Sequence, residues 1–226
     1  MVIRMDPNTS KNLGGIGALL VAIGALPLIG VYSTLLILIG LVLFLIGMKG
    51  LAEYFSESRI FNRALWGILM PLVGVVVAIG ILFTVALSAL VALGLSGIDW
   101  TNYRAFEEAF SSIDWGAASN INIIMSFAGS ALIAIVILVA AFIIGYYFLK
   151  SSFNTLAQKT GKGLFSTAGL LFFIGAILTF VAVGLILIWV GWVVATIAFL
   201  QLDLKAMPPD ATPKAVAPPP PPKAPI

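Results

Sequence analysis

The sequence predicts an all-α fold, namely a polytopic transmembrane helical bundle with six predicted spans and both termini cytoplasmic. Three observations predict this fold. The chain has 226 residues, of which 61% are apolar and 9% charged, whereas an ordinary soluble domain carries roughly 25% charged residues. The apolar residues gather in four long uncharged blocks. The positive charges between these blocks gather on one side of the membrane when the first and last blocks each cross it twice.

Composition excludes several classes of protein. The mean hydropathy is +1.14, and 12 basic and 9 acidic side chains cannot cover the surface of a soluble fold of this length. The chain has no Cys and no His. This excludes disulfides, thiolate nucleophiles, Ser–His and Cys–His pairs, and the usual zinc and haem ligands. We therefore expect no enzymatic activity and no cofactor, and the sequence offers no catalytic, cofactor-binding or metal-binding residue.

Block length predicts where the chain folds back. The uncharged blocks cover residues 13–48, 64–98, 115–149 and 163–202. A bilayer core of about 30 Å needs roughly 20 helical residues, but the first block would form a helix of about 54 Å, which tilt cannot absorb. Pro27 and the stretch Gly30–Ser33 predict a turn in it. The last block is equally long, and a turn is expected near 179–184.

The two middle blocks are each predicted to cross once. Pro71 is expected to kink the second block, leaving 60–70 as a lead-in to the span over 72–95. The third block begins with small and polar residues, so its apolar part starts near Ile121. The transmembrane domain 13–202 then has spans at about 13–30, 33–50, 66–96, 121–149, 164–181 and 184–202.

Positive charge decides between the possible numbers of spans. Six spans place eleven Lys and Arg residues on one side and only Arg104 on the other. Four spans give six against six, and mixed arrangements give eight against four or nine against three. The charges therefore favour a multi-pass protein of the cell membrane, with the N-terminus 1–12 and the proline-rich tail 203–226 in the cytoplasm.

The loop over residues 98–120 is predicted to lie outside. It carries four acidic residues against Arg104. Thr101 is expected to cap a short amphipathic helix over 101–112. Aromatic side chains fall on one face and at both flanks of this helix: Tyr103, Phe106 and Phe110, and Trp100 and Trp115. The helix is expected to rest on the lipid headgroups, with binding of a ligand or partner as the alternative.

The tail is compositionally distinct. Residues 207–226 hold nine of the twelve prolines, which favours an extended polyproline II chain that is poorly ordered in isolation. A flexible, solvated tail is the simpler interpretation. A partner with an aromatic-lined groove that recognises proline is the alternative.

All 21 charged residues lie outside the four uncharged blocks. Proton pumps, ion-coupled carriers and voltage sensors normally place ionisable groups at membrane depth. The polar groups left in the blocks are chiefly hydroxyls: Ser33, Thr34, Thr84, Ser88, Ser126, Ser130, Thr167, Thr179 and Thr196. Each is expected to bond the backbone of its own helix four residues back. The alternative is that some line a polar path or a ligand site.

Small residues recur at helical spacing. They are Gly14, Ala18 and Ala22, then Gly74 and Ala78, and then Ser126, Ser130 and Ala134. In lipid such residues let helix backbones approach closely. They predict packing within the bundle, with homo-oligomerisation as the alternative.

The first and last blocks show a weak internal repeat. An offset of 151 positions aligns Leu19, Leu20, Ile23, Gly24, Ala25 and Gly40 with Leu170, Leu171, Ile174, Gly175, Ala176 and Gly191. Both hairpins would have cytoplasmic ends, so the repeat is predicted to be parallel and not inverted.

Several stretches resemble a known family. They are Ser10–Leu20, Gly47–Ala52, Ile60–Phe61 and Ile174–Ala176. Together they are similar to the archaeal and bacterial integral membrane proteins grouped as domain of unknown function 996, over most of residues 8–202. The resemblance implies a small multi-pass membrane protein without an assigned activity. A zinc-binding module follows the spans in some members, but this chain lacks Cys and His and cannot hold it.

Together these observations predict a non-enzymatic structural or accessory subunit, or a homo-oligomer. The expected partners are the lipid bilayer, a second copy or another membrane protein, and a proline-recognising protein for the tail, with no nucleic acid. The alternative is a channel or carrier for a neutral or hydrophobic solute. Convergence of Thr84, Ser88, Ser126 and Ser130 on one cavity would favour that alternative.

Overall fold

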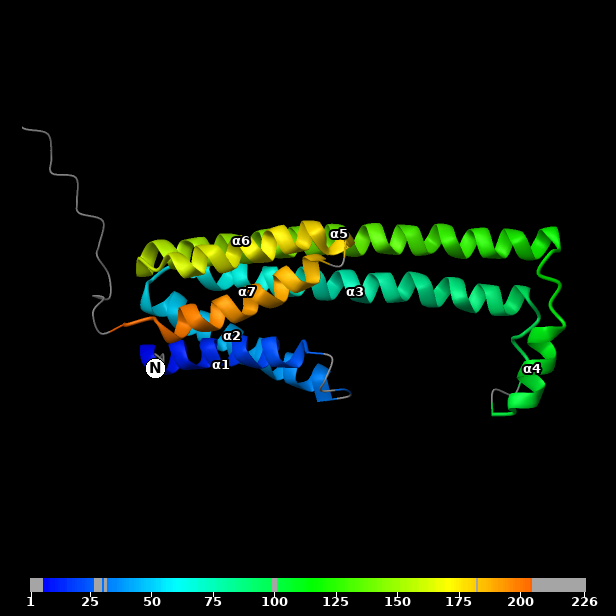
Figure 1. The fold of residues 1–226 in the computed structure, drawn as a ribbon, viewed down its shortest axis with the longest axis horizontal. Helices are drawn as coiled ribbons and strands as arrows, with labels where there is room; N and C mark the ends of the chain where they lie inside the picture. Colours follow the sequence, from blue (N-terminus) through cyan, green and yellow to red (C-terminus); the bar gives the residue numbers. More distant parts are fainter. Residues whose placement is uncertain (1–5, 27–29, 31, 99–100, 182, 205–226) are drawn as a thin grey trace, which may run out of the picture. The chain divides into compact units, whose positions relative to one another are not determined.

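The computed structural model describes residues 6–26, 30, 32–98, 101–181 and 183–204. All the regular structure in these residues is helical, which confirms the predicted all-α class (Figure 1). The elements are α1 (Pro7–Gly24), α2 (Ser33–Tyr54), α3 (Ser58–Ala92), α4 (Tyr103–Ser111), α5 (Ala118–Thr160), α6 (Gly163–Leu178), a short 3₁₀ helix η2 (Thr179–Val181) and α7 (Val183–Leu200). Trp100 and the proline-rich segment 207–226 lie outside the described residues.

The chain divides into two compact units. The first contains Met1–Asn62, Ser152–Ala168 and Trp192–Ile226, and the second contains Arg63–Ser151 and Gly169–Gly191. Each is described below through its own contacts.

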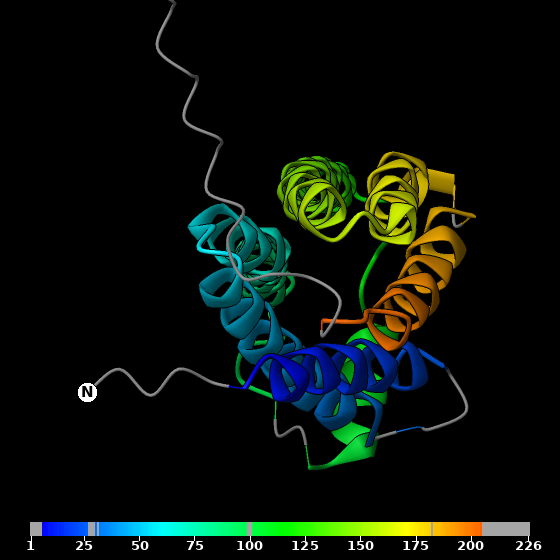
Figure 2. The same ribbon diagram turned by 90° about the vertical axis from the view of Figure 1, so that its left-hand side faces the viewer.

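In the first unit, α1 and α2 form an antiparallel pair (Figure 2). Glycines bring the two backbones together: a Cβ on Gly17 would overlap the backbone of Phe44, and one on Gly47 would overlap the backbone of Gly14. α1 also contacts α7, because the Phe199 ring lies against Gly14. A Cβ added to Gly14 would lie 2.7 Å from Phe199 Cε1. The first uncharged block is therefore two helices that fold back on each other, as its length predicts.

Aromatic rings from four helices form the core of this unit. The ring centroid of Phe44 lies 5.3 Å from that of Trp192 and 6.0 Å from that of Phe153. Phe165 and Phe199 pack edge to face at 5.1 Å. Such pairs are worth about 0.5–1.5 kcal/mol each beyond the area they bury. This core joins α2, α5, α6 and α7 at the ends of these helices that carry the charged linkers.

In the second unit, α3 and α5 run antiparallel. Gly67 meets Leu149, Gly74 meets Ala141, and the Pro71 ring lies against Gly145. α3 continues as one helix through Pro71, so the expected lead-in and the span that follows it belong to the same helix. Gly145 has no side chain and leaves room for the proline ring. The residues that follow are apolar, and in lipid they keep their backbone groups paired only by staying helical.

The second unit also contains the facing parts of α6 and α7. α6 runs beside α5 in both views (Figures 1 and 2), where Phe172 stacks on Tyr146 at 5.7 Å and Phe173 meets Tyr147 at 6.1 Å. The turn expected near 179–184 lies between α6 and α7, at η2.

The contacts inside the α6–α7 hairpin repeat those inside the α1–α2 hairpin. In the first hairpin, Gly24 contacts Ser33 and Ile37, and in the last hairpin Gly175 contacts Gly184 and Ile188, each 151 positions later. The contact of Gly40 with Val21 recurs in the same way as the contact of Gly191 with Phe172. An added Cβ would lie 2.9 Å from Ile37 Cγ1 in the first hairpin and 2.8 Å from Ile188 Cγ1 in the second. The internal repeat therefore extends from the sequence to the helix contacts.

Four helices are long and apolar enough to cross a membrane: α2, α3, α7 and the part of α5 from Ile121 to Thr160. α6 is apolar but has only 16 residues, and the first turns of α1 are polar and carry Lys11. The helices are consistent with a membrane protein. They yield four candidate spans where the sequence predicts six.

Substitution of Gly17 by Val tests the close approach of α1 and α2. The added side chain would meet backbone atoms, which cannot move aside, so we expect Gly17→Val to lower the free energy of unfolding by about 1–3 kcal/mol. Gly175→Val, in the repeated hairpin, should have a similar effect. Unfolding in mild detergent followed by circular dichroism measures both. Gly163→Val is the control, because a Cβ there meets nothing within 4 Å. Equal stability of Gly17→Val and Gly163→Val would contradict the contact.

Candidate functional site

Most of the predicted intramembrane hydroxyls bond their own helix. In α3 and α5, Thr84 donates to the Gly80 carbonyl at 2.8 Å, Ser88 to the Thr84 carbonyl at 2.9 Å, and Ser130 to the Ser126 carbonyl at 2.9 Å. Three more hydroxyls donate to the carbonyl four residues back: Thr167, Thr179 and Thr196. The expectation of local backbone bonding is confirmed for these six. Ser33 differs, because its hydroxyl reaches across the hairpin to the Gly24 carbonyl.

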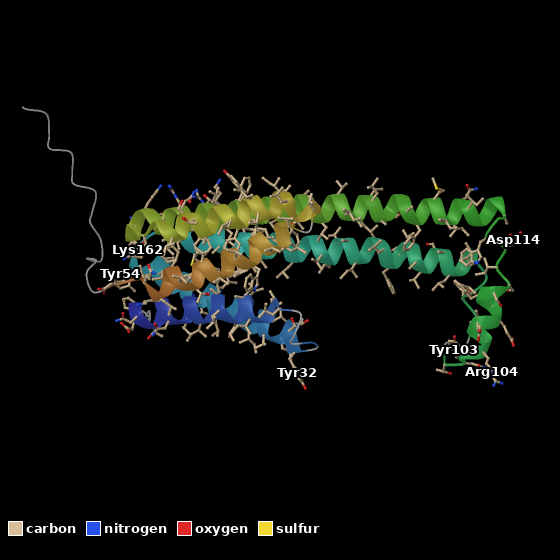
Figure 3. All side chains as sticks on the ribbon, in the orientation of Figure 1. Tyr32, Tyr54, Tyr103, Arg104, Asp114 and Lys162 are labelled. Carbon is tan, nitrogen blue, oxygen red and sulfur yellow. The ribbon has the colours of Figure 1, made fainter. Side chains whose placement is uncertain are left out.

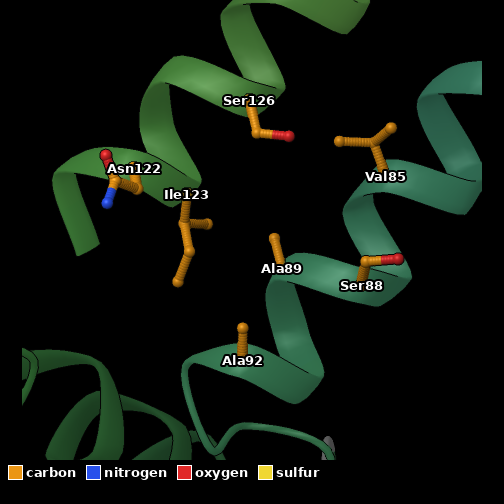
Figure 4. Close-up of a pocket in the computed structure, with 7 residues that line it drawn as sticks. All are labelled: Val85, Ser88, Ala89, Ala92, Asn122, Ile123 and Ser126. Carbon is orange, nitrogen blue, oxygen red and sulfur yellow. The ribbon is translucent and has the colours of Figure 1, made fainter. Parts of the chain in front are cut away.

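A small cavity lies between α3 and α5 near their loop-side ends (Figure 4). Its volume is about 260 Å³, and it is lined by Val85, Ser88, Ala89, Ala92, Asn122, Ile123 and Ser126. The methyl groups of Ala89 and Ala92 point into it, whereas the Ser88 hydroxyl points away (Figure 4). The hollow exists because two alanines stand where larger side chains would fill the space between the helices. Its lining is predominantly apolar.

The four hydroxyls that would mark a solute path do not converge. Ser88 and Ser126 line the cavity, but Thr84 and Ser130 do not. The hydroxyls of Thr84, Ser88 and Ser130 are already engaged with backbone carbonyls. The arrangement therefore provides no continuous polar lining between α3 and α5.

Polar bonds join α3 to α5 at the end where the charged linkers begin. Arg63 Nη1 donates to Ser151 Oγ at 2.6 Å, and the buried Ser152 Oγ donates to the Ile60 carbonyl at 2.6 Å. Lys150 Nζ lies 4.5 Å from the centroid of the Phe173 ring on α6, in a cation–π contact. These bonds fix the level at which the α3–α5 hairpin passes from apolar to charged sequence.

A second cavity, of about 330 Å³, lies at the turn between α2 and α3. It is lined by Lys49, Ala52, Glu53, Ser56, Ser58, Phe61 and Asn62. One ammonium and one carboxylate offset each other in this lining, so the cavity has no excess charge that would select an anion or a cation. Ser56 adopts a left-handed conformation in the turn, with φ 49°.

The loop-side helix forms largely where the sequence predicts it. α4 begins at Tyr103, and Asn102 caps it by accepting a hydrogen bond from the Ala105 amide at 3.3 Å. The prediction of Thr101 as the cap is wrong by one residue, since Asn at the next position is at least as good a cap. Tyr103 is exposed (Figure 3). Phe110 packs against Trp115 at 5.2 Å. The Phe106 side chain lies outside the described residues.

No metal-binding cluster forms in the part of the chain that the structure describes, where no three acidic side chains come together. The feature that sequence reasoning missed is the exposure of α3 and α5. Only 6% of the apolar window in each of these helices is buried, compared with 39% in α2 and 44% in α7. The side chains along both helices are mostly carbon (Figure 3).

Comparison with known proteins agrees with the resemblance noted above. Residues 36–193 match the family described as "Protein of unknown function (DUF996)". An uncharacterised protein of Methanocaldococcus jannaschii is 28% identical over 207 residues, which cover 91% of this chain and 99% of that protein. No solved structure matches the chain. The family match runs from the start of α2 into α7 and includes the whole α3–α5 hairpin. The chain therefore belongs to the DUF996 family.

Proposed function

We propose that this protein is an integral membrane protein without enzymatic activity that acts through helix packing, as a structural or accessory subunit or as a homo-oligomer. One observation carries the proposal. α3 and α5 are the longest apolar helices of the chain, and their own chain covers only 6% of each apolar window. Such helices present most of their surface to lipid or to other transmembrane helices.

The forces that act between helices in lipid support this role. Lipid tails are as apolar as Leu, so helices associate through close packing and small residues and gain little from burial alone. The hairpins α1–α2 and α6–α7 satisfy this requirement inside the chain, through the glycine contacts described above. α3 and α5 satisfy it only with each other along much of their length. Their outer faces remain available to a partner.

The chemistry of the helices supports a role without catalysis. Catalysis by acid–base or nucleophilic groups needs ionisable or activated side chains placed together. The four uncharged blocks hold none of the 21 charged residues, and the hydroxyls of Thr84, Ser88 and Ser130 donate hydrogen bonds to carbonyls of their own helices. A channel or carrier for a neutral solute has less support, because the hydroxyls do not share one cavity.

For the topology we propose six spans in the cell membrane, with both termini and both charged linkers in the cytoplasm and the loop 98–120 outside. The eleven-to-one distribution of positive charge supports it. Folding back of α1 on α2 and of α6 on α7 supports it as well, because each hairpin returns to the side from which it started. The expected partners remain the bilayer, a second copy or another membrane protein, and a proline-recognising protein for the tail 203–226.

Cysteine labelling tests this topology without background, because the chain has no native Cys. Single cysteines replace Tyr32 and Tyr103, both exposed and predicted outside, and Glu57 and Gln158, predicted inside. A membrane-impermeant maleimide added to intact cells should label the first two positions. The other two should react only after the cells are opened. Labelling of positions 57 and 158 from opposite sides would contradict the proposal, and so would a cysteine at 32 that neither side can reach.

Stoichiometry tests the proposed role. Native mass spectrometry of the protein extracted in mild detergent should show two or more copies, or one copy with another membrane protein, because the α3–α5 hairpin is incompletely covered in a single chain. Dilution in detergent separates specific complexes from crowded micelles, since a specific complex persists when the protein-to-micelle ratio falls. A strictly monomeric particle without a bound protein would count against a packing role.

A further inference from the structure

The face of α3 directed away from α5 carries a continuous apolar stripe. α3 faces α5 through Gly67, Gly74 and Ala78, which are buried. At 100° per residue, the residues about half a turn away are Val76, Gly80, Phe83, Leu87 and Val91, and all of them are exposed. The four large side chains have exposed fractions between 47% and 70%. We call these five residues the α3 stripe.

α5 carries a matching stripe on its own outward face. It faces α3 through Gly145, Ala141 and Ala134, and half a turn away lie Ile121, Met125, Gly129, Leu132 and Val136, all exposed. We call these residues the α5 stripe. The contact of Gly74 with Ala141, and the shared cavity near Ala89 and Ser126, set the antiparallel register. This register puts residues 76–91 of α3 at the same level as about residues 124–139 of α5, so the two stripes overlap in depth over residues 80–91 of α3 and 124–136 of α5.

Each stripe contains a glycine that its own chain does not explain. In the same two helices, Gly67, Gly74 and Gly145 all meet the facing helix, where a Cβ would be crowded. At Gly80 and Gly129 an added Cβ would meet nothing within 4 Å. A glycine inside a helix costs about 1 kcal/mol relative to alanine. The other three glycines of these two helices stand where the facing helix approaches.

Helix length gives a separate reason for a protein partner. Val91 lies 28 residues beyond Arg63, a distance of about 42 Å along the helix. The hydrocarbon core is only about 30 Å thick. To keep both Arg63 and Val91 within the hydrocarbon core, the α3–α5 hairpin would have to tilt by about 45° from the bilayer normal, which is more than transmembrane helices usually tilt. With Arg63 at the cytoplasmic boundary, the outer end of each stripe therefore reaches beyond the lipid tails.

We propose that the α3 stripe of one copy packs on the α5 stripe of a second copy. The inference rests on the proposed packing function and names its surface and its partner. Copies that share one membrane orientation bring the two stripes together antiparallel and at overlapping depths, as α3 and α5 already pair inside each chain. The stripes carry no charge, so nothing in them selects a partner of opposite charge.

The area agrees with a specific contact. With the exposed side chains that flank them, such as Ile79 and Ile133, two stripes in contact would bury at most on the order of 1,200 Å² in total, which is the lower limit of the range for stable interfaces. Each copy offers one stripe of each kind on opposite sides of its hairpin. The contact is therefore head to tail, and repetition of it closes a ring or extends a row of copies.

Glycine substitution tests the interface directly. Gly80→Leu and Gly129→Leu each add a side chain into open space in the single chain but into the partner in the complex. We expect each to weaken self-association at least about tenfold, equivalent to 1.4 kcal/mol, as measured by native mass spectrometry across a dilution series. The control is Gly163→Leu, another glycine with nothing within 4 Å of an added Cβ, which lies outside both stripes and should leave association unchanged.

Disulfide crosslinking provides a second readout that does not depend on a destabilising change. Phe83→Cys and Leu132→Cys, which lie at the same level on the two stripes, are expressed as separate tagged variants and mixed in one membrane. The proposal predicts a crosslink between the two variants. Crosslinking of Phe83→Cys only with itself would overturn the stripe-to-stripe contact, and so would an oligomer that is unchanged in both leucine variants. In those cases the packing function would stand. A wild-type monomer without any partner would overturn both.

Discussion

Close approach of paired helix backbones is the interaction on which this structure depends. At Gly17 and Gly47 a single methyl group would overlap the facing backbone, and the close contact at Gly24 recurs at Gly175 in the last hairpin. In water, burial of apolar side chains would supply most of the stabilisation, but in lipid this driving force between helices nearly vanishes. Short backbone distances and well-packed rings are what remain. The aromatic core around Phe44 and Phe199 therefore acts together with the glycine contacts and does not replace them.

The two outer hairpins and the middle hairpin solve this packing problem differently. α1–α2 and α6–α7 repeat one set of contacts at a separation of 151 residues, and α2 and α7 are well covered by their own chain. α3 and α5 are longer and are covered mainly by each other. This difference assigns internal stability to the repeated hairpins and an outward-facing role to the middle one. Because of this difference, the proposed function rests on the exposed faces of α3 and α5 and not on a pocket.

Much of the fold follows from the sequence by simple physical arguments. The helical class and the two folding-back points follow from block length against bilayer thickness. A local rule for proline predicts a kink at Pro71, but it cannot show that Gly145, 74 residues later, faces the proline ring and leaves room for it. Asn102 and Thr101 are adjacent caps of similar quality, and the start of the helix decides between them. Gly80 and Gly129 were not singled out, because in a chain with 22 glycines only the structure shows which of them lack a neighbour.

The central claim is that the α3–α5 hairpin lies in lipid with one face of each helix covered by another copy. Nitroxide labels placed one at a time along residues 72–91 test it most directly, through collisions with oxygen, which enters the bilayer, and with a water-soluble nickel complex, which does not. The account predicts minima of oxygen accessibility on two opposite faces of α3, the face that meets α5 and the α3 stripe, with nickel reaching only the outer end. Maxima of oxygen accessibility along the α3 stripe, or uniform nickel accessibility along the whole segment, would contradict it.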